Sequence, residues 1–150
     1  LFTLLVERAY KHRYISNKAA FLKDLWEREQ SASTGLDRGI AIPHSRSGSA
    51  GSVVIVIARL STPIQYETLD GKPVDLVFMI AASDDTQEYL QTLSLLAKSL
   101  KKPGLIDRLR SIHSEYEMFD LLAHDERFWL SGNFTPAVPG CSMSISNVSK

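Results

Sequence analysis

The stretch Val74-Asp-Leu-Val-Phe-Met-Ile-Ala-Ala82 decides the fold, because it is as long as one strand and almost wholly apolar. Ser52-Val-Val-Ile-Val-Ile-Ala58 repeats this pattern upstream, and the turn Leu69-Asp-Gly-Lys-Pro73 lies between the two runs. Continuous apolar runs of this length are typical of strands that are covered on both faces. The chain is therefore predicted to be an α/β protein, a three-layer sandwich with helices on both faces of a central sheet.

Helical spacing of apolar residues predicts helices before the first buried strand and after the second. The helix after the second strand carries a leucine stripe that we assign to the core. The expected helices run from the N-terminus to near His12, from a cap at Ser16 or Asn17 to near Glu29, from a cap at Ser83-Asp-Asp85 through Leu90, Leu93, Leu96, Ala97 and Leu100, from Leu105 to about Arg110, and from a capping box at Ser114-Glu-Tyr-Glu117 through Leu122.

The composition changes after Asp125, where aromatic residues are scattered among Gly, Pro and Ser without any period. We therefore predict one domain over residues 1–125 and a C-terminal tail or linker over residues 126–150.

The bulk composition excludes several classes of protein. The 150 residues include 17 basic and 17 acidic ones, so no net charge attracts nucleic acid or an anionic membrane, and neither is expected as a direct partner. The longest apolar run, Val53 to Ala58, is too short to span a bilayer, and residues 1–10 do not read as a signal peptide. The single cysteine, Cys141, fits a reducing compartment, and a cytoplasmic location is expected.

One of the four histidines, His44, stands in a distinctive setting. It follows Gly39-Ile-Ala-Ile42, a short β-prone segment that Pro43 ends, and it precedes the polar stretch Ser45-Arg-Ser-Gly48. We expect a short strand to present an exposed imidazole at its C-terminal end, with a flexible loop beginning at once. In open α/β sheets this edge is where ligands bind.

A histidine in this position suits phosphoryl transfer. The nucleophilic ring nitrogen must be unprotonated, the other nitrogen must be held by a hydrogen bond, and cations must neutralise the phosphoryl oxygens. Arg28 is a candidate for that charge, with Arg38 and Arg46 as alternatives. The backbone N–H groups of Gly48 and Gly51 are further candidate anion contacts.

Other polar residues have simpler explanations. The remaining histidines, His12, His113 and His124, fall on predicted helices among charges, where solvent exposure is expected. Ser45 points away from His44 on an extended chain, so the two do not form a hydrolase pair. Asp84 and Asp85 suit a helix cap better than a metal site, and neither a cofactor nor a metal is expected.

Four segments, taken together, resemble a known family. Trp26-Glu-Arg-Glu29, Ser33-Thr-Gly-Leu36, Gly39-Ile-Ala-Ile-Pro-His44 and Leu69-Asp-Gly-Lys-Pro-Val-Asp-Leu76 occur in the order found in enzyme IIA domains of the mannitol/fructose class of the bacterial sugar phosphotransferase system. The similarity covers roughly Leu4 to Leu122.

The resemblance implies a mixed sheet flanked by helices and a phosphotransferase activity without a cofactor. The carrier protein HPr would donate a phosphoryl group to His44, which would pass it to a cysteine of enzyme IIB for uptake of a fructose- or mannitol-type sugar. The arginine of the family's Arg-Glu pair falls on Arg28, whose role would be to stabilise the phosphoryl oxygens.

One position departs from the family pattern. Relatives usually carry a second histidine at the start of the helix after the second buried strand, and that place is Tyr89 here. A tyrosine can donate a hydrogen bond but carries no positive charge at neutral pH. Tyr89 is thus a candidate site residue, and its presence favours a slower or regulatory variant.

Two alternatives to sugar transport remain open at this point. The domain could be a regulatory module, of the nitrogen-related kind or attached to a transcription regulator, whose partner binding depends on phosphorylation of His44. It could also be a silent fold, which would require a buried His44 bonded through both ring nitrogens. The sequence names neither the sugar nor the oligomeric state, and a homo-oligomer is left open.

Overall fold

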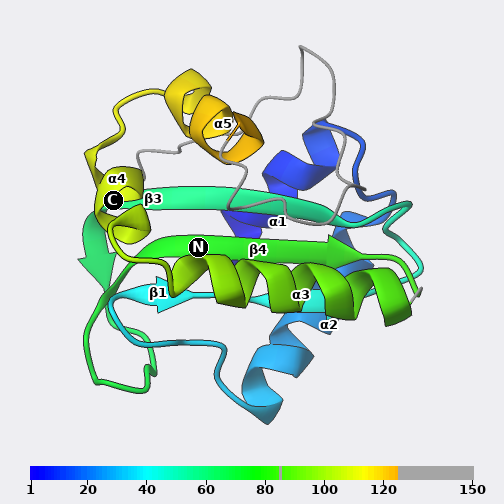
Figure 1. The fold of residues 1–150 in the computed structure, drawn as a ribbon. Coiled ribbons are helices and arrows are strands. Elements are labelled where there is room, and N and C mark those ends of the chain that lie inside the picture. Colours follow the sequence, from blue (N-terminus) through cyan, green and yellow to red (C-terminus); the bar gives the residue numbers. More distant parts are fainter. Residues whose placement is uncertain (85, 125–150) are drawn as a thin grey trace.

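The chain folds into a sheet with helices on both sides, as the computed structural model of residues 1–84 and 86–124 shows (Figure 1). The elements in chain order are α1 (Phe2–Lys11), α2 (Lys18–Ser31), β1 (Ile40–Ala41), β2 (His44–Arg46), β3 (Val54–Ile64), β4 (Val74–Ala82), α3 (Thr86–Leu100), α4 (Leu105–Ser111) and α5 (Glu115–His124). The predicted second buried strand coincides with β4.

Strand β4 is the centre of the sheet. β3 pairs with it antiparallel on one side, while β1 and β2 pair with it in parallel on the other, so the sheet is mixed. β1 lies beside Leu76 and Val77, and β2 lies beside Ile80 to Ala82. The segment from β1 to β2 therefore forms one edge of the sheet, and its two ends lie near opposite ends of β4.

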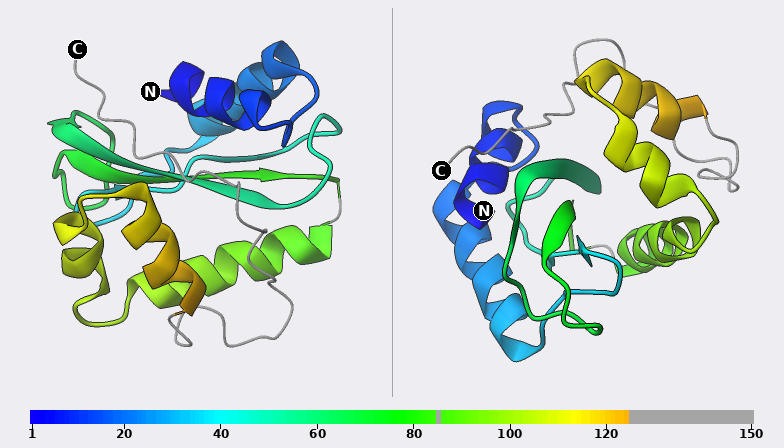
Figure 2. Two further views of the ribbon diagram at one scale, coloured as in Figure 1. Left: turned by 90° about the horizontal axis from the view of Figure 1, so that it is seen from above. Right: turned by 90° about the vertical axis from the view of Figure 1, so that its left-hand side faces the viewer.

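The helices cover the two faces of the sheet in separate layers, which confirms the predicted three-layer sandwich (Figure 2). α1 and α2 pack on one face, where Val77, Met79 and Ala81 of β4 join their core. α3, α4 and α5 cover the other face, where Leu76, Phe78 and Ile80 are buried. Successive residues of a strand point to opposite faces, so a strand covered on both sides must be apolar at nearly every position, as β4 is.

Two predicted helix caps are present in the structure. The Asn17 side chain accepts a hydrogen bond of 3.0 Å from the Ala20 N–H, which caps α2. At α5, Ser114 Oγ accepts from the Glu117 N–H at 3.1 Å. Glu117 Oε2 in turn accepts from the His113 N–H, one residue further out than in the standard capping box.

Two predictions about the core need correction. β3 extends beyond Ala58 to Ile64, because its pairing with β4 resumes at Ile64 after an irregularity. Leu90 is 54% exposed, whereas Leu96 and Leu100 are buried as expected. The buried face of α3 runs through Thr92, Leu96 and Ser99 at spacings of four and three residues, and this face turns Leu90 outward.

Some predictions fall outside the described residues. The cap residue Asp85 and the tail over residues 126–150 belong to this group, so the division at residue 125 stays a prediction.

Candidate active site

His44 begins a strand and does not open a loop, which corrects the sequence-based expectation. Pro43 interrupts the edge of the sheet because it lacks an N–H, but its carbonyl accepts a hydrogen bond of 2.9 Å from the Ile80 N–H. The edge then resumes with His44 opposite Ile80. His44 is only 8% exposed, so the prediction of a well-exposed imidazole was also wrong.

The imidazole is held in one tautomer. His44 Nδ1 lies 2.6 Å from the backbone oxygen of Ile42, and a carbonyl oxygen can only accept, so Nδ1 carries the proton. The proton on Nδ1 leaves the lone pair on Nε2. The silent-fold alternative required both nitrogens to be bonded, and among the described residues only Nδ1 has a partner.

The surroundings favour the neutral imidazole. Burial lowers the pKa of His44, and the positive charge of Arg28 lowers it further. The hydrogen bond to Ile42 and the negative charge of Glu29 act in the opposite direction without reversing the shift. The depressed pKa keeps Nε2 unprotonated, and therefore nucleophilic, at neutral pH.

The C-terminal part of α2 brings Arg28 and Glu29 to the same region. Arg28 Nη1 donates to the Ala32 carbonyl at 2.8 Å, which anchors the side chain to the end of its own helix. Arg28 forms no salt bridge with residues 1–84 or 86–124. Its charge instead acts on His44 and on the Tyr89 phenol, so the structure brings Arg28 together with both predicted partners.

The first turns of α3 supply Tyr89. Its ring centroid lies 5.8 Å from that of His44, with the rings tilted by 47°. The guanidinium carbon of Arg46 lies 5.7 Å from the centroid of the same tyrosine ring. Burial raises the pKa of Tyr89, against the opposing charges of Arg28 and Arg46, so the phenol stays neutral at physiological pH.

Glu29 belongs to a network that the sequence analysis missed. Its carboxylate accepts from the Thr34 N–H at 2.9 Å, from the Thr34 hydroxyl at 2.5 Å and from the Ser33 hydroxyl at 3.1 Å. Tyr66 lies within 3.2 Å of the Thr34 hydroxyl, and burial raises the pKa of its phenol. The network ties the end of α2 to the segment before β1, since Thr34 also accepts from the Ile42 N–H. Glu29 stood in a quoted motif, but nothing in the sequence indicated these partners.

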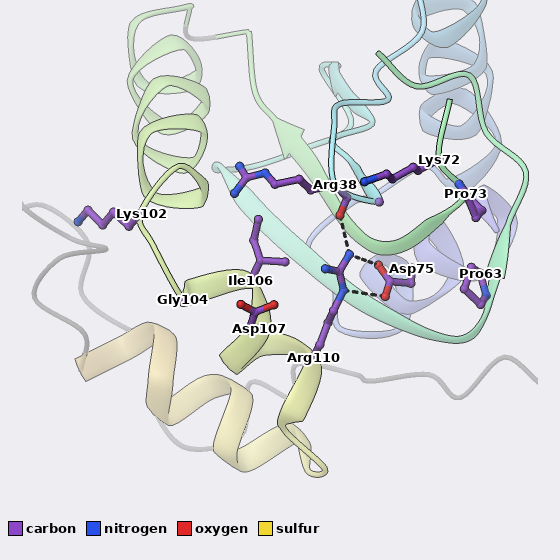
Figure 3. Close-up of a pocket in the computed structure, with 11 residues that line it drawn as sticks. Arg38, Pro63, Lys72, Pro73, Asp75, Lys102, Gly104, Ile106, Asp107 and Arg110 are labelled. Carbon is purple, nitrogen blue, oxygen red and sulfur yellow. Dashed lines mark hydrogen bonds and ion pairs between the residues drawn. The ribbon is translucent and has the colours of Figure 1, made fainter. Parts of the chain in front are cut away.

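Arg38, one of the alternative phosphate ligands, lies away from His44. It lines a pocket of about 450 Å³ near Asp75, five residues from the position on β4 that pairs with His44 (Figure 3). Arg110 makes a two-pronged ion pair with Asp75 there, at 2.7 and 2.8 Å, and donates to the Arg38 carbonyl at 2.5 Å. The Arg38 guanidinium donates to the Leu100 carbonyl. Arg38 is therefore ruled out as a ligand of a group on His44.

The other polar residues and glycines considered in the sequence lie as follows. Ser45 pairs with Ala81 on the opposite face from His44, as predicted. Gly48 lies near the Asp84 carboxylate, 3.6 Å from the place of an added Cβ, so a negative charge faces that loop. His113 is exposed, and His12 packs against Tyr14 with a centroid separation of 6.1 Å. The side chain of His124 is outside the described set, as is Cys141.

The described part of the chain offers neither a metal site nor a membrane-spanning helix. Residues 1–84 and 86–124 hold no group of three or more His, Cys, Asp or Glu side chains suited to a metal ion. None of the helices in those ranges has both the length and the apolarity required to cross a bilayer.

Comparison with known proteins gives relatives in two functional settings. The chain is 36% identical over 121 residues to a nitrogen regulatory protein of Klebsiella oxytoca. The aligned region covers 79% of this chain and 74% of that protein. It is 34% identical over 114 residues to the fructose-specific EIIABC component of Bacillus subtilis, covering 75% of this chain and 18% of that protein. The chain spans 62% to 74% of the length of three nitrogen regulatory relatives.

The fold also matches a solved complex. The complex of enzyme IIAMtl with phosphorylated enzyme IIBMtl from Escherichia coli aligns with a TM-score of 0.67 at 22% identity, covering 81% of this chain and 84% of that one. A family model described as "Phosphoenolpyruvate-dependent sugar phosphotransferase system, EIIA 2" matches residues 1–125. The chain therefore belongs to the EIIA 2 family of the phosphoenolpyruvate-dependent sugar phosphotransferase system.

Proposed function

We propose that this chain is a phosphocarrier that accepts a phosphoryl group on Nε2 of His44. The observation that carries the proposal is the 2.6 Å hydrogen bond from His44 Nδ1 to the Ile42 carbonyl, which leaves the lone pair on Nε2. Burial supports it, because a lowered pKa keeps that nitrogen unprotonated.

The donor in this proposal is the phosphohistidine of HPr. The N–P bond of phospho-HPr breaks, its imidazole keeps the electron pair, and a new bond forms between phosphorus and His44 Nε2. The transferred group carries nearly two negative charges at neutral pH. Arg28, whose charge already acts on His44, would compensate for them.

The acceptor in this proposal is a cysteine of an enzyme IIB. Its thiolate attacks phosphorus, the N–P bond on His44 breaks, and Nε2 regains its lone pair. A relay of this kind would work in the cytoplasm and would serve the uptake of a fructose- or mannitol-type sugar. The fructose-specific relative and the fold shared with the IIAMtl–IIBMtl complex support it.

A regulatory module is the second candidate. It is favoured by the nitrogen regulatory protein at 36% identity and by Tyr89, a neutral phenol at the place where relatives usually carry a second histidine. In that role phosphorylation of His44 would change which partner binds, and no enzyme IIB would be needed.

The first test is phosphorylation with phosphoenolpyruvate, enzyme I and HPr, followed by mass spectrometry of the acid-labile phosphate. We expect rapid labelling of His44 that is lost in His44→Ala. His113→Ala provides a matched control, because His113 is an exposed histidine outside the site. Absence of labelling, or labelling that survives His44→Ala, would refute the phosphocarrier proposal.

A second test separates the two roles. The phosphorylated chain is mixed with purified enzyme IIB of the fructose or mannitol type, and the phosphocysteine is quantified. Transfer within seconds supports the sugar relay. A phosphohistidine that persists in the presence of each enzyme IIB excludes that relay and leaves the regulatory role.

A further inference from the structure

Arg46 projects from β2 on the same side as His44. Residues two apart in a strand point to the same face, and the parallel register places His44 opposite Ile80 and Arg46 opposite Ala82. Ile80 and Ala82 belong to the core under α3, so both side chains leave the strand toward that helix. The two side chains thus reach the same side of the sheet from adjacent positions on its edge.

The Tyr89 ring contacts both of them. The centroid of the Tyr89 ring lies 5.8 Å from the centroid of the His44 ring and 5.7 Å from the guanidinium carbon of Arg46. A guanidinium at this distance from an aromatic ring is attracted by its π electrons, and the attraction limits the positions that a long exposed side chain samples. The Tyr89 ring is therefore one of the contacts that can hold Arg46 on this side of the sheet.

The two arginines act on different groups of the site. Arg28 acts on both His44 and Tyr89, whereas Arg46 acts on Tyr89. We call Arg28 the inner cation, because its charge acts on the imidazole itself as well as on the phenol. A phosphoryl group on Nε2 would extend beyond the imidazole, where a second cation becomes relevant.

We infer that Arg46 is a second phosphoryl-binding residue of this site and that the Tyr89 ring positions it. The inference rests on the proposed function and deepens it. A phosphoryl group carrying nearly two negative charges is poorly balanced by Arg28 alone, and a guanidinium matches its oxygens geometrically. On this view Tyr89 works through its ring face, and its hydroxyl is secondary.

The test loads His44 without any partner protein, so that docking effects do not enter. Potassium phosphoramidate is the donor: its P–N bond breaks, the nitrogen leaves as ammonia, and the bond from phosphorus to Nε2 forms. The second ionisation of the bound phosphoryl group is then followed by ³¹P NMR against pH. A nearby cation favours the dianion and lowers this pKa, and a purely structural role of the residue would leave it unchanged.

The variants are Arg46→Gln, Arg46→Lys, Tyr89→Leu, Tyr89→Phe and the double variant Arg46→Gln/Tyr89→Leu. Arg46→Gln should raise the phosphoryl pKa by about half a pH unit, which corresponds to about a threefold weaker hold on the dianion. Tyr89→Leu should produce most of the same rise, and Tyr89→Phe and Arg46→Lys should produce less. The double variant should not exceed the larger single effect, because both changes remove one contact.

Lys98→Gln is the matched control, since it removes an exposed cation from the same helix as Tyr89, and circular dichroism establishes that each variant is folded. An unchanged phosphoryl pKa in folded Arg46→Gln overturns the inference while His44 labelling stands. A rise in Tyr89→Phe as large as in Tyr89→Leu also overturns it, because the hydroxyl would then be the active group. If the wild-type chain takes no phosphoryl group on His44 from either donor, the proposed function fails first and the inference fails with it.

Discussion

The two ends of the β1–β2 edge both gather arginines, but they use them differently. Near Asp75, Arg110 is held by a two-pronged ion pair (Figure 3). Arg38 donates to the Leu100 carbonyl. Near His44, Arg28 has no carboxylate partner among residues 1–84 and 86–124, and its charge acts on an imidazole and a phenol. The cations at the Asp75 end are thus tied to the fold by hydrogen bonds, whereas the charge of Arg28 acts on the groups of the site, as the proposed phosphoryl binding requires.

The backbone that leads into this edge has an unusual conformation. Arg38 has φ of +57° and Gly39 has φ of +74°, and both precede β1 directly. The Arg38 N–H donates to Asp70 Oδ2, and its carbonyl accepts from Arg110, so this unusual conformation is held from both sides. The chain then runs through β1 and Pro43 to His44.

The largest effect is expected for Gly39→Ala. An added Cβ would lie 2.8 Å from Arg110 Nη2 and 3.0 Å from Asp75 Oδ1, at a positive φ that also disfavours alanine. We expect a loss of about 3 kcal/mol in the free energy of unfolding, measured by urea denaturation. Gly71→Ala is the control, because φ is +70° there but nothing lies within 4 Å, so about 1 kcal/mol is expected. Equal losses in the two variants would show that close packing at Gly39 contributes nothing.

Asp75→Asn should come next. It removes the charge that holds Arg110, in a pair whose side chains are 23% and 34% exposed. Because the pair is only partly buried, we expect about 2 kcal/mol of destabilisation rather than the larger cost of a fully buried pair. Asp37→Asn, beside Arg38 on the surface, should change the unfolding free energy by less than about 0.5 kcal/mol. If the Asp75 end serves stability alone, phospho-HPr should label His44 of the folded Asp75→Asn protein at the wild-type rate.

Arg28→Gln should show the reverse pattern, with a small change in stability and a larger change in reactivity. Removing the inner cation should slow labelling from phospho-HPr about tenfold, since donors aimed at developing charge contribute strongly and this site is partly open to water. Lys23 lies on the same helix and pairs with Glu27 on the surface, so Lys23→Gln should leave labelling unchanged. A loss of stability as large as that of Asp75→Asn would remove the distinction between the two ends.

The sequence predicted the architecture well because the decisive signals were local. β4 is apolar on both faces, and α2 and α5 begin at side-chain caps, so period and capping were sufficient. The extension of β3 to Ile64 could not be predicted, since it depends on pairing with Val74. Leu90 was misplaced because a leucine stripe does not say which of two adjacent helix faces meets the sheet.

The site was harder to predict than the fold, for a physical reason. The resemblance identified Arg28 and Tyr89, and the structure brings both close to His44. Without the resemblance, Arg38 could not be separated from Arg28, because the residue pattern does not say which end of the sheet each arginine reaches. The partial burial of His44 and the acceptor role of Ile42 arise from tertiary packing, which spacing along the chain does not record.

The smallest and most specific effect concerns the pKa of His44. The positive charge of Arg28 disfavours the imidazolium and lowers this pKa, whereas the negative charge of Glu29 raises it. Arg28→Gln should therefore raise the pKa of His44, and Glu29→Gln should lower it, as measured by an NMR titration of the imidazole Cε1–H. Because protonation removes the lone pair on Nε2, the acidic limit of labelling should move to higher pH in Arg28→Gln and to lower pH in Glu29→Gln.

Asp75→Asn provides the comparison for this titration, since it alters charge at the other end of the edge and should leave the pKa of His44 in place. Opposite shifts in the two α2 variants, with no shift in Asp75→Asn, would mean that the charges around His44 act locally and independently of the ion pair at Arg110. Shifts in the same direction would mean that both variants chiefly change the burial of the imidazole, because water entering the site would raise the pKa whichever charge was removed.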